Sequence, residues 1–218
     1  FLDEELSRLD EAHMVEVYRQ FLRDLGWLEL KEADLELRVK PNAADNVEQL
    51  LASYGLDKAD NLIALNTGGS WPTKRWPSEK FAALADELIQ KQVGAVIFTG
   101  GPSDIERVDK IKEMMSTEAV NLAGETTVAE LAALAEKSAV MISGDSGPVH
   151  VAAAVGTPTI ALFGPSDEKK YRPYGAENQI ITNQIDCRPC GEHDCPLEHH
   201  NCLEEITVTE VLAQVGLE

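Results

Sequence analysis

The chain has 218 residues, with 19 Lys and Arg against 38 Asp and Glu, which gives a formal net charge of −19. This charge argues against a broad surface for nucleic acid or anionic membrane, because binding a polyanion needs a basic patch. Hydrophobic residues make up 44% of the sequence, yet no apolar run approaches the roughly 20 residues of a membrane span. Collagen-like and low-complexity character are excluded as well. We expect a soluble, acidic and compact protein.

The first forty residues, 1–40, are predicted to be an entry segment ahead of the main domain. Apolar residues recur at roughly helical spacing from Leu2 to Leu25, and Gly26 ends the run. From Asp34 to Val39 the residues alternate as in a short strand. The sequence starts at Phe1, without an initiator Met or a signal peptide, so we expect a portion of a longer chain.

Residues 41–218 are predicted to form one Rossmann-like domain, an α/β fold with a doubly wound parallel sheet. After a helix from Pro41 to Tyr54, four short apolar runs each lead into a turn rich in Gly, Ser or Asp. Continuous apolar runs suit strands buried on both faces, and helical segments separate them. The predicted strands are 62–65, 95–98, 139–142 and 159–163, and the predicted helices are 78–92, 103–115, 127–137 and 147–155. An irregular Cys/His-rich loop at 183–206 and a C-terminal helix at 207–215 complete the domain.

The turn after the first of these strands, residues 66–77, has the chemistry of a phosphate-binding loop. Two adjacent glycines permit close backbone approach, Ser70 offers a hydroxyl, and Lys74 offers a positive charge. A P-loop NTPase is excluded, because Thr73 stands where that motif needs its second Gly and Arg75 where it needs Ser or Thr. The alternative interpretation is a glycine-rich loop with a surface Lys-Arg pair.

The turn at 99–104 follows the second strand and starts a helix, with Ser103 as the expected N-cap. It lacks the G-x-G-x-x-G fingerprint of a standard dinucleotide site. Ser103 and Asp104 lie where a ribose hydroxyl could be bound, although helix capping alone explains Ser103 equally well.

The strongest signal is the segment 143–154, which follows a strand and opens a helix. Ser146 can cap this helix, and the backbone N–H groups near Ser146 and Gly147 would face an anion. His150 lies one turn into the helix, at the same end as Asp145. A histidine there is most often structural, but the Asp-Ser-Gly turn favours ligand binding. Catalysis by a Ser-His-Asp triad is a poor fit, because the nucleophile-elbow spacing is absent.

All four cysteines lie close together in the sequence, with three histidines between them. Their spacing is Cys187-x2-Cys190-x4-Cys195-x6-Cys202. This density of thiols suggests a structural zinc site, although the spacing is not that of a zinc ribbon. Disulfides and reduced thiols packed as small hydrophobes remain alternatives.

These motifs occur together and in order, and together they resemble glycosyltransferase family 9, the lipopolysaccharide heptosyltransferases. The resemblance covers about residues 10 to 215. It rests on Gly69-Ser70…Lys74-Arg75-Trp76-Pro77, Thr99-Gly100-Gly101, Asp145-Ser146-Gly147-Pro148-x-His150, Leu162-Phe163-Gly164-Pro165-Ser166 and the late Cys cluster. The family has a GT-B architecture of two Rossmann-like domains. This chain looks like the C-terminal, donor-binding portion, with the interdomain segment in front.

The resemblance implies a donor site for a nucleotide-diphosphate sugar, typically ADP-heptose, and an acceptor in the lipopolysaccharide core. Ser70, Lys74, Ser146 and Gly147 would bind the diphosphate. Asp145 and His150 would approach the sugar, and the turn at 103–104 the ribose.

Transfer would be inverting and would need no cofactor, and the location would be the cytoplasm or the inner face of the inner membrane. The family's catalytic base is acidic and lies in the N-terminal domain, so no base is assigned here. We therefore expect this chain to bind the donor without transferring sugar unaided.

Two alternatives remain open. One is a non-catalytic module of the same fold that binds a nucleotide or a sugar phosphate, since fold alone does not fix function. The other is a metal-sensing module built on the Cys/His loop, against which the phosphate-type turns argue.

Overall fold

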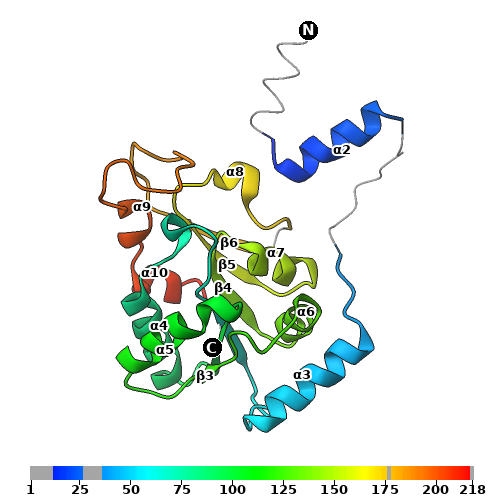
Figure 1. The fold of residues 1–218 in the computed structure, drawn as a ribbon, viewed down its shortest axis with the longest axis vertical. Coiled ribbons are helices and arrows are strands. Elements are labelled where there is room, and N and C mark those ends of the chain that lie inside the picture. Colours follow the sequence, from blue (N-terminus) through cyan, green and yellow to red (C-terminus); the bar gives the residue numbers. More distant parts are fainter. Residues whose placement is uncertain (1–11, 27–35, 176–177, 217–218) are drawn as a thin grey trace.

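The fold is built around a six-stranded, all-parallel sheet (Figure 1). A computed structural model describes residues 12–26, 36–175 and 178–216. The strands lie in the order β3-β2-β1-β4-β5-β6. They are β1 (Leu62–Asn66), β2 (Ala95–Thr99), β3 (Val120–Asn121), β4 (Val140–Gly144), β5 (Thr159–Phe163) and β6 (Asn178–Thr182). The predicted α/β class with a parallel sheet is thus confirmed.

The direction in which strands are added reverses at β1. The chain first adds β2 and β3 on one side of β1, and then crosses to add β4, β5 and β6 on the other. The Cα atoms of Asn66 and Ser143 are partners in the β1–β4 register, so these two strands end together. Such a reversal opens a crevice at the carboxyl ends of the strands, where ligands of doubly wound sheets bind.

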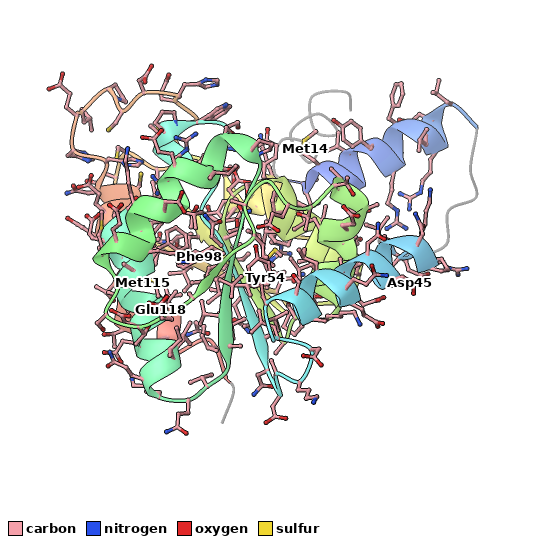
Figure 2. All side chains as sticks on the ribbon, turned by 60° about the horizontal axis from the view of Figure 1, so that its bottom comes forward. Met14, Asp45, Tyr54, Phe98, Met115 and Glu118 are labelled. Atoms are coloured by element: carbon pink, nitrogen blue, oxygen red, sulfur yellow. The ribbon has the colours of Figure 1, made fainter. Side chains whose placement is uncertain are left out.

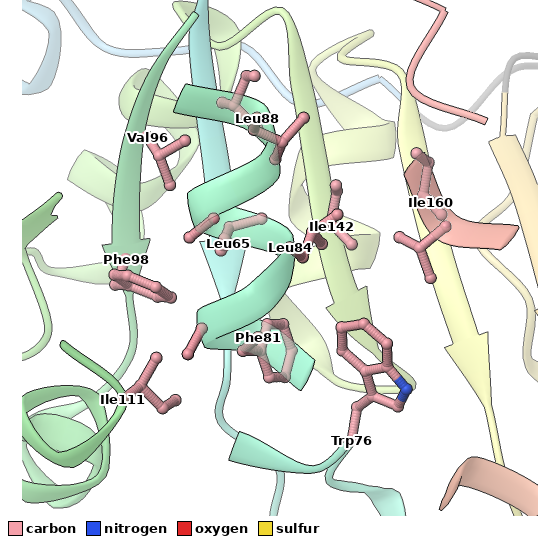
Figure 3. Close-up of a cluster of buried hydrophobic side chains, with 14 of the residues drawn as sticks. Leu65, Trp76, Phe81, Leu84, Leu88, Val96, Phe98, Ile111, Ile142 and Ile160 are labelled. Carbon is pink, nitrogen blue, oxygen red and sulfur yellow. The ribbon is translucent and has the colours of Figure 1, made fainter. Parts of the chain in front are cut away.

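One face of the sheet is covered by α4 (Ser78–Gln90), α5 (Ile105–Met114), α9 (Asn201–Glu204) and α10 (Val208–Leu212). Apolar side chains of α4 and of the central strands meet in this layer (Figure 3). Trp76 is fully buried there and donates from Nε1 to the Ile206 carbonyl oxygen at 3.1 Å. Its ring meets Phe81 edge-on, with the ring centroids 5.1 Å apart. Trp76 thereby joins the turn after β1 to the C-terminal segment.

The other face is covered by α3 (Pro41–Ser53), α6 (Val128–Glu136) and α7 (Gly147–Ala154). Ala152 of α7 is fully buried on this face. The small side chain lets α7 approach the sheet closely. Two packed helical layers on a hydrophobic sheet explain why the strands read as continuous apolar runs.

Two predictions about secondary structure are wrong. The short strand predicted over 34–39 is absent at residues 36–39, the part of it that the structure describes. There the chain runs alone beside α7, and the Leu37 amide donates to the Ala154 carbonyl oxygen at 2.7 Å. The helix predicted over 103–115 is a 3-10 turn, η2 (Pro102–Asp104), followed by α5. Ser103 is not its N-cap, because the Asp104 carboxylate accepts from the Gly101 amide at 2.9 Å and closes that turn.

Helix α2 (Met14–Asp24) extends away from the sheet from its Met14 end (Figure 2). The His13 ring holds this end, because Nε2 donates to the Arg172 carbonyl oxygen at 2.7 Å while Nδ1 accepts from the Val15 amide. Glu16 accepts a hydrogen bond of 2.7 Å from the Tyr174 hydroxyl. The predicted stop at Gly26 is confirmed, and the run before residue 12 lies outside the described residues. Every helix of the described segments is too short or too polar to cross a bilayer.

Candidate functional site at the carboxyl ends of β1 and β4

Lys74 and Asp145 form an ion pair across the point where the strand order reverses. Lys74 closes the 3-10 turn η1 (Pro72–Lys74) in the loop after β1, and Asp145 directly follows β4. Their Nζ and Oδ2 atoms are 2.6 Å apart, and the side chains are only 16% and 7% exposed. Among the described residues, no well-directed hydrogen bond reaches Asp145 Oδ2. The ion pair with Lys74 is therefore what offsets the burial of this oxygen.

Aromatic and backbone contacts fix the position of Lys74. Its Nζ lies 4.3 Å from the centre of the Trp71 ring, a cation–π contact. Arg75 Nε donates to the Gly69 carbonyl oxygen at 2.8 Å and ties the two ends of the loop together. A Cβ atom on Gly144 would overlap the Lys74 carbonyl oxygen, so the close approach of β4 to this turn requires a glycine. The turn that carries Lys74 is thus held from several sides.

The N-terminus of α7 opens beside this pair. Ser146 occupies the N-cap position as predicted, but its hydroxyl makes no capping bond and instead lies 2.9 Å from the Ser143 hydroxyl. Gly147 is exposed, and a Cβ atom built on it would meet nothing within 4 Å. The first amides of any helix lack intrahelical acceptors and carry partial positive charge. The start of α7 is therefore open to solvent at Gly147.

His150 lies in the second turn of α7, and its side chain is exposed. Protein atoms nevertheless crowd the ring and partly displace its water, which lowers the pKa of His150 from its usual 6.5. The nearby carboxylate of Asp145 opposes this shift, while His13 and Lys74 add to it. The imidazole is therefore neutral at pH 7 and can both accept and donate a hydrogen bond.

The remaining predicted residues lie in the loops after β1 and β2. Ser70 and Ser103 are exposed, and Asp104 is half-buried. A Cβ atom on Gly68 would lie 2.7 Å from Asp104 Oδ2, so the Asp104 carboxylate packs directly against the loop after β1. The structure thus places Asp104 beside the loop that also carries Lys74.

Thr67 is a further polar residue of this loop, and no sequence motif predicts a role for it. It directly follows β1, is only 1% exposed, and its hydroxyl has no hydrogen-bond partner among the described residues. A buried hydroxyl without a partner is uncommon in folded proteins. The signal available in the sequence was its position between a buried strand and two glycines.

The Cys/His-rich loop at 183–206 packs against the turn that carries Lys74 and forms hydrogen bonds with it. The Thr73 hydroxyl lies 2.9 Å from the Glu192 carbonyl oxygen and 3.0 Å from that of His193. His200 Nε2 donates to the Thr73 carbonyl oxygen at 2.7 Å. The His193 ring stacks on Trp71, with the ring centroids 3.6 Å apart. These contacts between distant parts of the chain could not be predicted from either motif alone.

The four cysteines are unpaired and line one small cavity. Burial raises the pKa of Cys202 to about 11. Backbone hydrogen bonds, chiefly from His200, lower the pKa of the Cys195 thiol. In the described part of the chain, no three His, Cys, Asp or Glu side chains are arranged to hold a metal ion. The predicted zinc site stays a prediction.

A doubly wound, six-stranded parallel sheet whose strand order reverses at β1 defines a class of protein, the Rossmann-like α/β proteins. Family comparison is more specific, because the model of glycosyltransferase family 9 (heptosyltransferase) matches residues 1–201. The chain belongs to this family, and the resemblance inferred from its motifs is confirmed.

Curated relatives are similar over most of this chain. Lipooligosaccharide heptosyltransferase 2 of Campylobacter jejuni is 27% identical over 213 residues, which cover 95% of this chain and 64% of the relative. Lipopolysaccharide heptosyltransferase 2 of Escherichia coli K12 is 32% identical over 168 residues, or 75% of this chain and 48% of the relative. The chain thus spans about half to two thirds of these relatives.

Solved structures of this family are likewise similar to most of this chain and are longer than it. A family 9 glycosyl transferase from Veillonella parvula superposes with a TM-score of 0.80 at 29% identity, covering 93% of this chain and 58% of that one. The E. coli ADP-heptose lipopolysaccharide heptosyltransferase II gives a TM-score of 0.72 at 27% identity, covering 87% and 55%. The Rossmann-like fold of this chain therefore matches about half of each longer protein.

Proposed function

We propose that this chain carries the donor site of a heptosyltransferase that transfers heptose from ADP-heptose to the lipopolysaccharide core. Membership of glycosyltransferase family 9 and the similarity to the E. coli ADP-heptose lipopolysaccharide heptosyltransferase II support this donor. The observation that carries the proposal is the Lys74–Asp145 pair beside the open N-terminus of α7, at the strand-order reversal.

The diphosphate of the donor suits this crevice. Lys74 Nζ supplies a positive charge, and the free amides of the first turn of α7, at the exposed Gly147, supply hydrogen-bond donors. The orphan hydroxyl of Thr67 and the exposed hydroxyl of Ser70 lie on the loop that carries Lys74. The net charge of −19 repels anions from the protein as a whole. A local site of this kind offsets that repulsion for a small anion such as a diphosphate, but not for a large polyanion.

The donors at this site would act on the leaving group. In an inverting transfer an acceptor hydroxyl attacks the anomeric carbon from the face opposite the diphosphate, and the C–O bond to the diphosphate breaks with its electron pair. Lys74, Ser146 and Gly147 would stabilise the charge that develops on the departing oxygen. Asp145 and His150 would contact the sugar, and Ser103 and Asp104 the ribose. The acceptor's proton passes to a base that we assign to no residue of this chain.

Binding is tested by calorimetric titration with ADP, GDP, UDP and CMP. We expect ADP to bind best and Lys74→Ala to weaken it by about 10- to 150-fold, the loss of one hydrogen bond to a charged group. Lys91→Ala is the control, because Lys91 forms a surface ion pair with Glu87. Equal binding of ADP by the wild-type chain and by Lys74→Ala would contradict the proposed site.

Catalysis is tested separately. We expect no sugar transfer by the 218-residue chain alone, so turnover in the presence of ADP-heptose and acceptor would show that a base lies within it. We further propose that the protein works in the cytoplasm, at the inner face of the inner membrane. Four unpaired cysteines support a reducing compartment.

A further inference from the structure

We propose that Ser143 is a positioning residue for ligand binding, because its hydroxyl holds the hydroxyl of Ser146 away from the amides of α7 and leaves those amides to the diphosphate. The identity of the ligand rests on the proposed function. The arrangement of the two hydroxyls rests on the structure of the turn alone.

Ser146 stands where a helix cap is expected but does not act as one. In α6 and α10 the N-cap hydroxyls of Thr127 and Thr207 accept from the amides three residues further on, at 3.3 and 3.2 Å. The equivalent partner of Ser146 is the Val149 amide, yet the Ser146 side chain makes no capping hydrogen bond. Since an N-cap hydroxyl normally satisfies one of the first amides of its helix, another contact must hold this one elsewhere.

That contact is the hydroxyl of Ser143, in β4. Ser143 is fully buried, and its Oγ lies 2.9 Å from Ser146 Oγ. Two carbonyl oxygens are also within reach of Ser143 Oγ, Asn66 Oδ1 at 3.4 Å and that of Gly144 at 2.9 Å. Both can only accept, and a serine hydroxyl has a single proton. Ser143 therefore donates to a carbonyl oxygen and accepts from Ser146.

Asn66 supports this direction from β1. Its Nδ2 donates to the carbonyl oxygen of Thr99 at 3.2 Å and to the Thr99 hydroxyl oxygen at 3.1 Å. Because a carbonyl oxygen can only accept, the amide nitrogen of Asn66 faces β2 and its oxygen faces Ser143. Asn66, Thr99 and Ser143 are all at most 2% exposed, so water does not compete for these bonds. The hydrogen bonds thus run from β2 through β1 and β4 to the start of α7.

The first turn of α7 has few amides to spare. Pro148 lies in this turn and has no N–H group, so residues 147–149 offer only the amides of Gly147 and Val149. A Ser146 hydroxyl that was free to rotate would accept from Val149, and the ligand would lose one of these two amides. Removing the Ser143 hydroxyl should therefore create a cap that competes with the diphosphate.

The test compares Ser143→Ala with the double variant that also carries Ser146→Ala, by calorimetric titration with ADP and by thermal melts. Ser143→Ala should bind ADP about fivefold more weakly than the wild-type chain, the cost of breaking one cap. The double variant should bind ADP about fivefold more tightly than Ser143→Ala, because alanine cannot cap the helix. It should nevertheless melt roughly 2–4 °C lower, because the new cap is lost. A merely structural role of Ser143 would not produce tighter binding together with a lower Tm.

Ser138→Ala is the matched control. Ser138 is a buried serine in the loop between α6 and β4, and its hydroxyl donates to the Leu134 carbonyl oxygen at 2.8 Å. Its substitution should lower Tm and leave the affinity for ADP unchanged. Should Ser143→Ala fail to fold, Ser143→Cys takes its place, because a thiol fills the space and forms only weak hydrogen bonds.

Equal affinity of the wild-type chain and Ser143→Ala for ADP overturns the proposal, and so does a double variant that binds no more tightly than Ser143→Ala. A crystal structure of Ser143→Ala checks the first step without ADP. Ser146 Oγ should lie about 3 Å from the Val149 nitrogen, and an unmoved Oγ overturns the proposal. If that oxygen moves but the wild-type chain binds no ADP, the proposed function fails while the control of Ser146 by Ser143 is supported.

Discussion

The buried ion pair at the candidate site predicts an unusual response to Asp145→Asn. In the unliganded chain the Asp145 carboxylate lies 2.6 Å from Lys74 Nζ, where a phosphate oxygen of the ligand would also bind. The carboxylate and the diphosphate therefore compete for one ammonium group. The substitution keeps the shape of the side chain and removes its charge, while the Trp71 ring still holds Lys74 Nζ at 4.3 Å. We expect ADP to bind more tightly to the variant.

The magnitude follows from the geometry. A phosphate oxygen at about 3 Å from Nζ would lie about 5 Å from the Asp145 carboxylate. Two unit charges at that distance repel by roughly 3 kcal/mol at an effective dielectric constant of about 20. Solvent and salt at the open mouth of the crevice reduce this to about 1–2 kcal/mol, or a five- to thirtyfold gain in affinity.

The same substitution should destabilise the unliganded protein. Removing one partner of a fully buried pair costs about 3–5 kcal/mol. Lys74 is 16% exposed and can turn toward water, so we expect a loss of about 1–2 kcal/mol. For a chain of this size that lowers Tm by roughly 2–8 °C. A less stable protein that binds ADP more tightly is a pair of opposite effects that general damage to the fold would not produce.

Calorimetry with ADP at low and high salt, together with thermal melts, measures both effects. Asp109→Asn is the control, because Asp109 lies on α5 and accepts an exposed hydrogen bond from the Asn121 side chain. The gain in affinity should shrink as salt rises. If Asp145→Asn weakens ADP binding tenfold or more, the carboxylate aids the diphosphate site and the competition argument is refuted.

The remaining predictions concern the glycines, His150 and Trp76. Gly147→Ala should leave Tm unchanged but weaken ADP binding, because its Cβ would enter only the space assigned to the ligand; unaltered binding would move the ligand elsewhere. Gly144→Ala should lower both Tm and the affinity for ADP, because its Cβ would displace the turn that carries Lys74. We expect the free energy of unfolding to fall by about 1–3 kcal/mol. Since the folded state lowers the pKa of His150, the unfolded chain binds more protons, and stability is lost as pH falls below 6.5. Melts from pH 7.5 to 5.5 should show a smaller loss in His150→Gln, and parallel curves would refute this. Trp76→Ala should cost about 3–5 kcal/mol in denaturant unfolding, and a loss below 1 kcal/mol would contradict its role in the core.

The central strands could be predicted from the sequence because their residues are apolar on both faces. The edges could not. β3 has only two residues, and β6 starts with Asn178 and ends with Thr182, half-buried residues that carry no continuous apolar signal. At a sheet edge the strand is covered on fewer sides, so its composition approaches that of a loop.

The candidate site was predictable as a set of loops but not as a geometry. The motifs indicated Lys74 and Asp145 as separate ligand-binding residues. Their direct pairing depends on the β1–β4 register, which no local pattern encodes. The stacking of His193 on Trp71 depends likewise on where a long loop returns. At the turn after β2 even a local prediction was wrong. The sequence pattern predicted Ser103 as the helix cap, whereas the carboxylate of the neighbouring Asp104 closes the turn.

The contacts between the turn after β1 and residues 192–206 have a consequence for folding during translation. On the ribosome the loop with Thr67 and Lys74 emerges well before the residues that hold it. Glu192 and His193, which contact Thr73, follow it by 119 and 120 residues, and Ile206, which contacts Trp76, follows by 130. Until then the nascent chain has the loop that carries Lys74 but not the support that shapes it. Ligand affinity should therefore appear late and abruptly in a series of nascent-chain lengths, once residue 206 is clear of the ribosome.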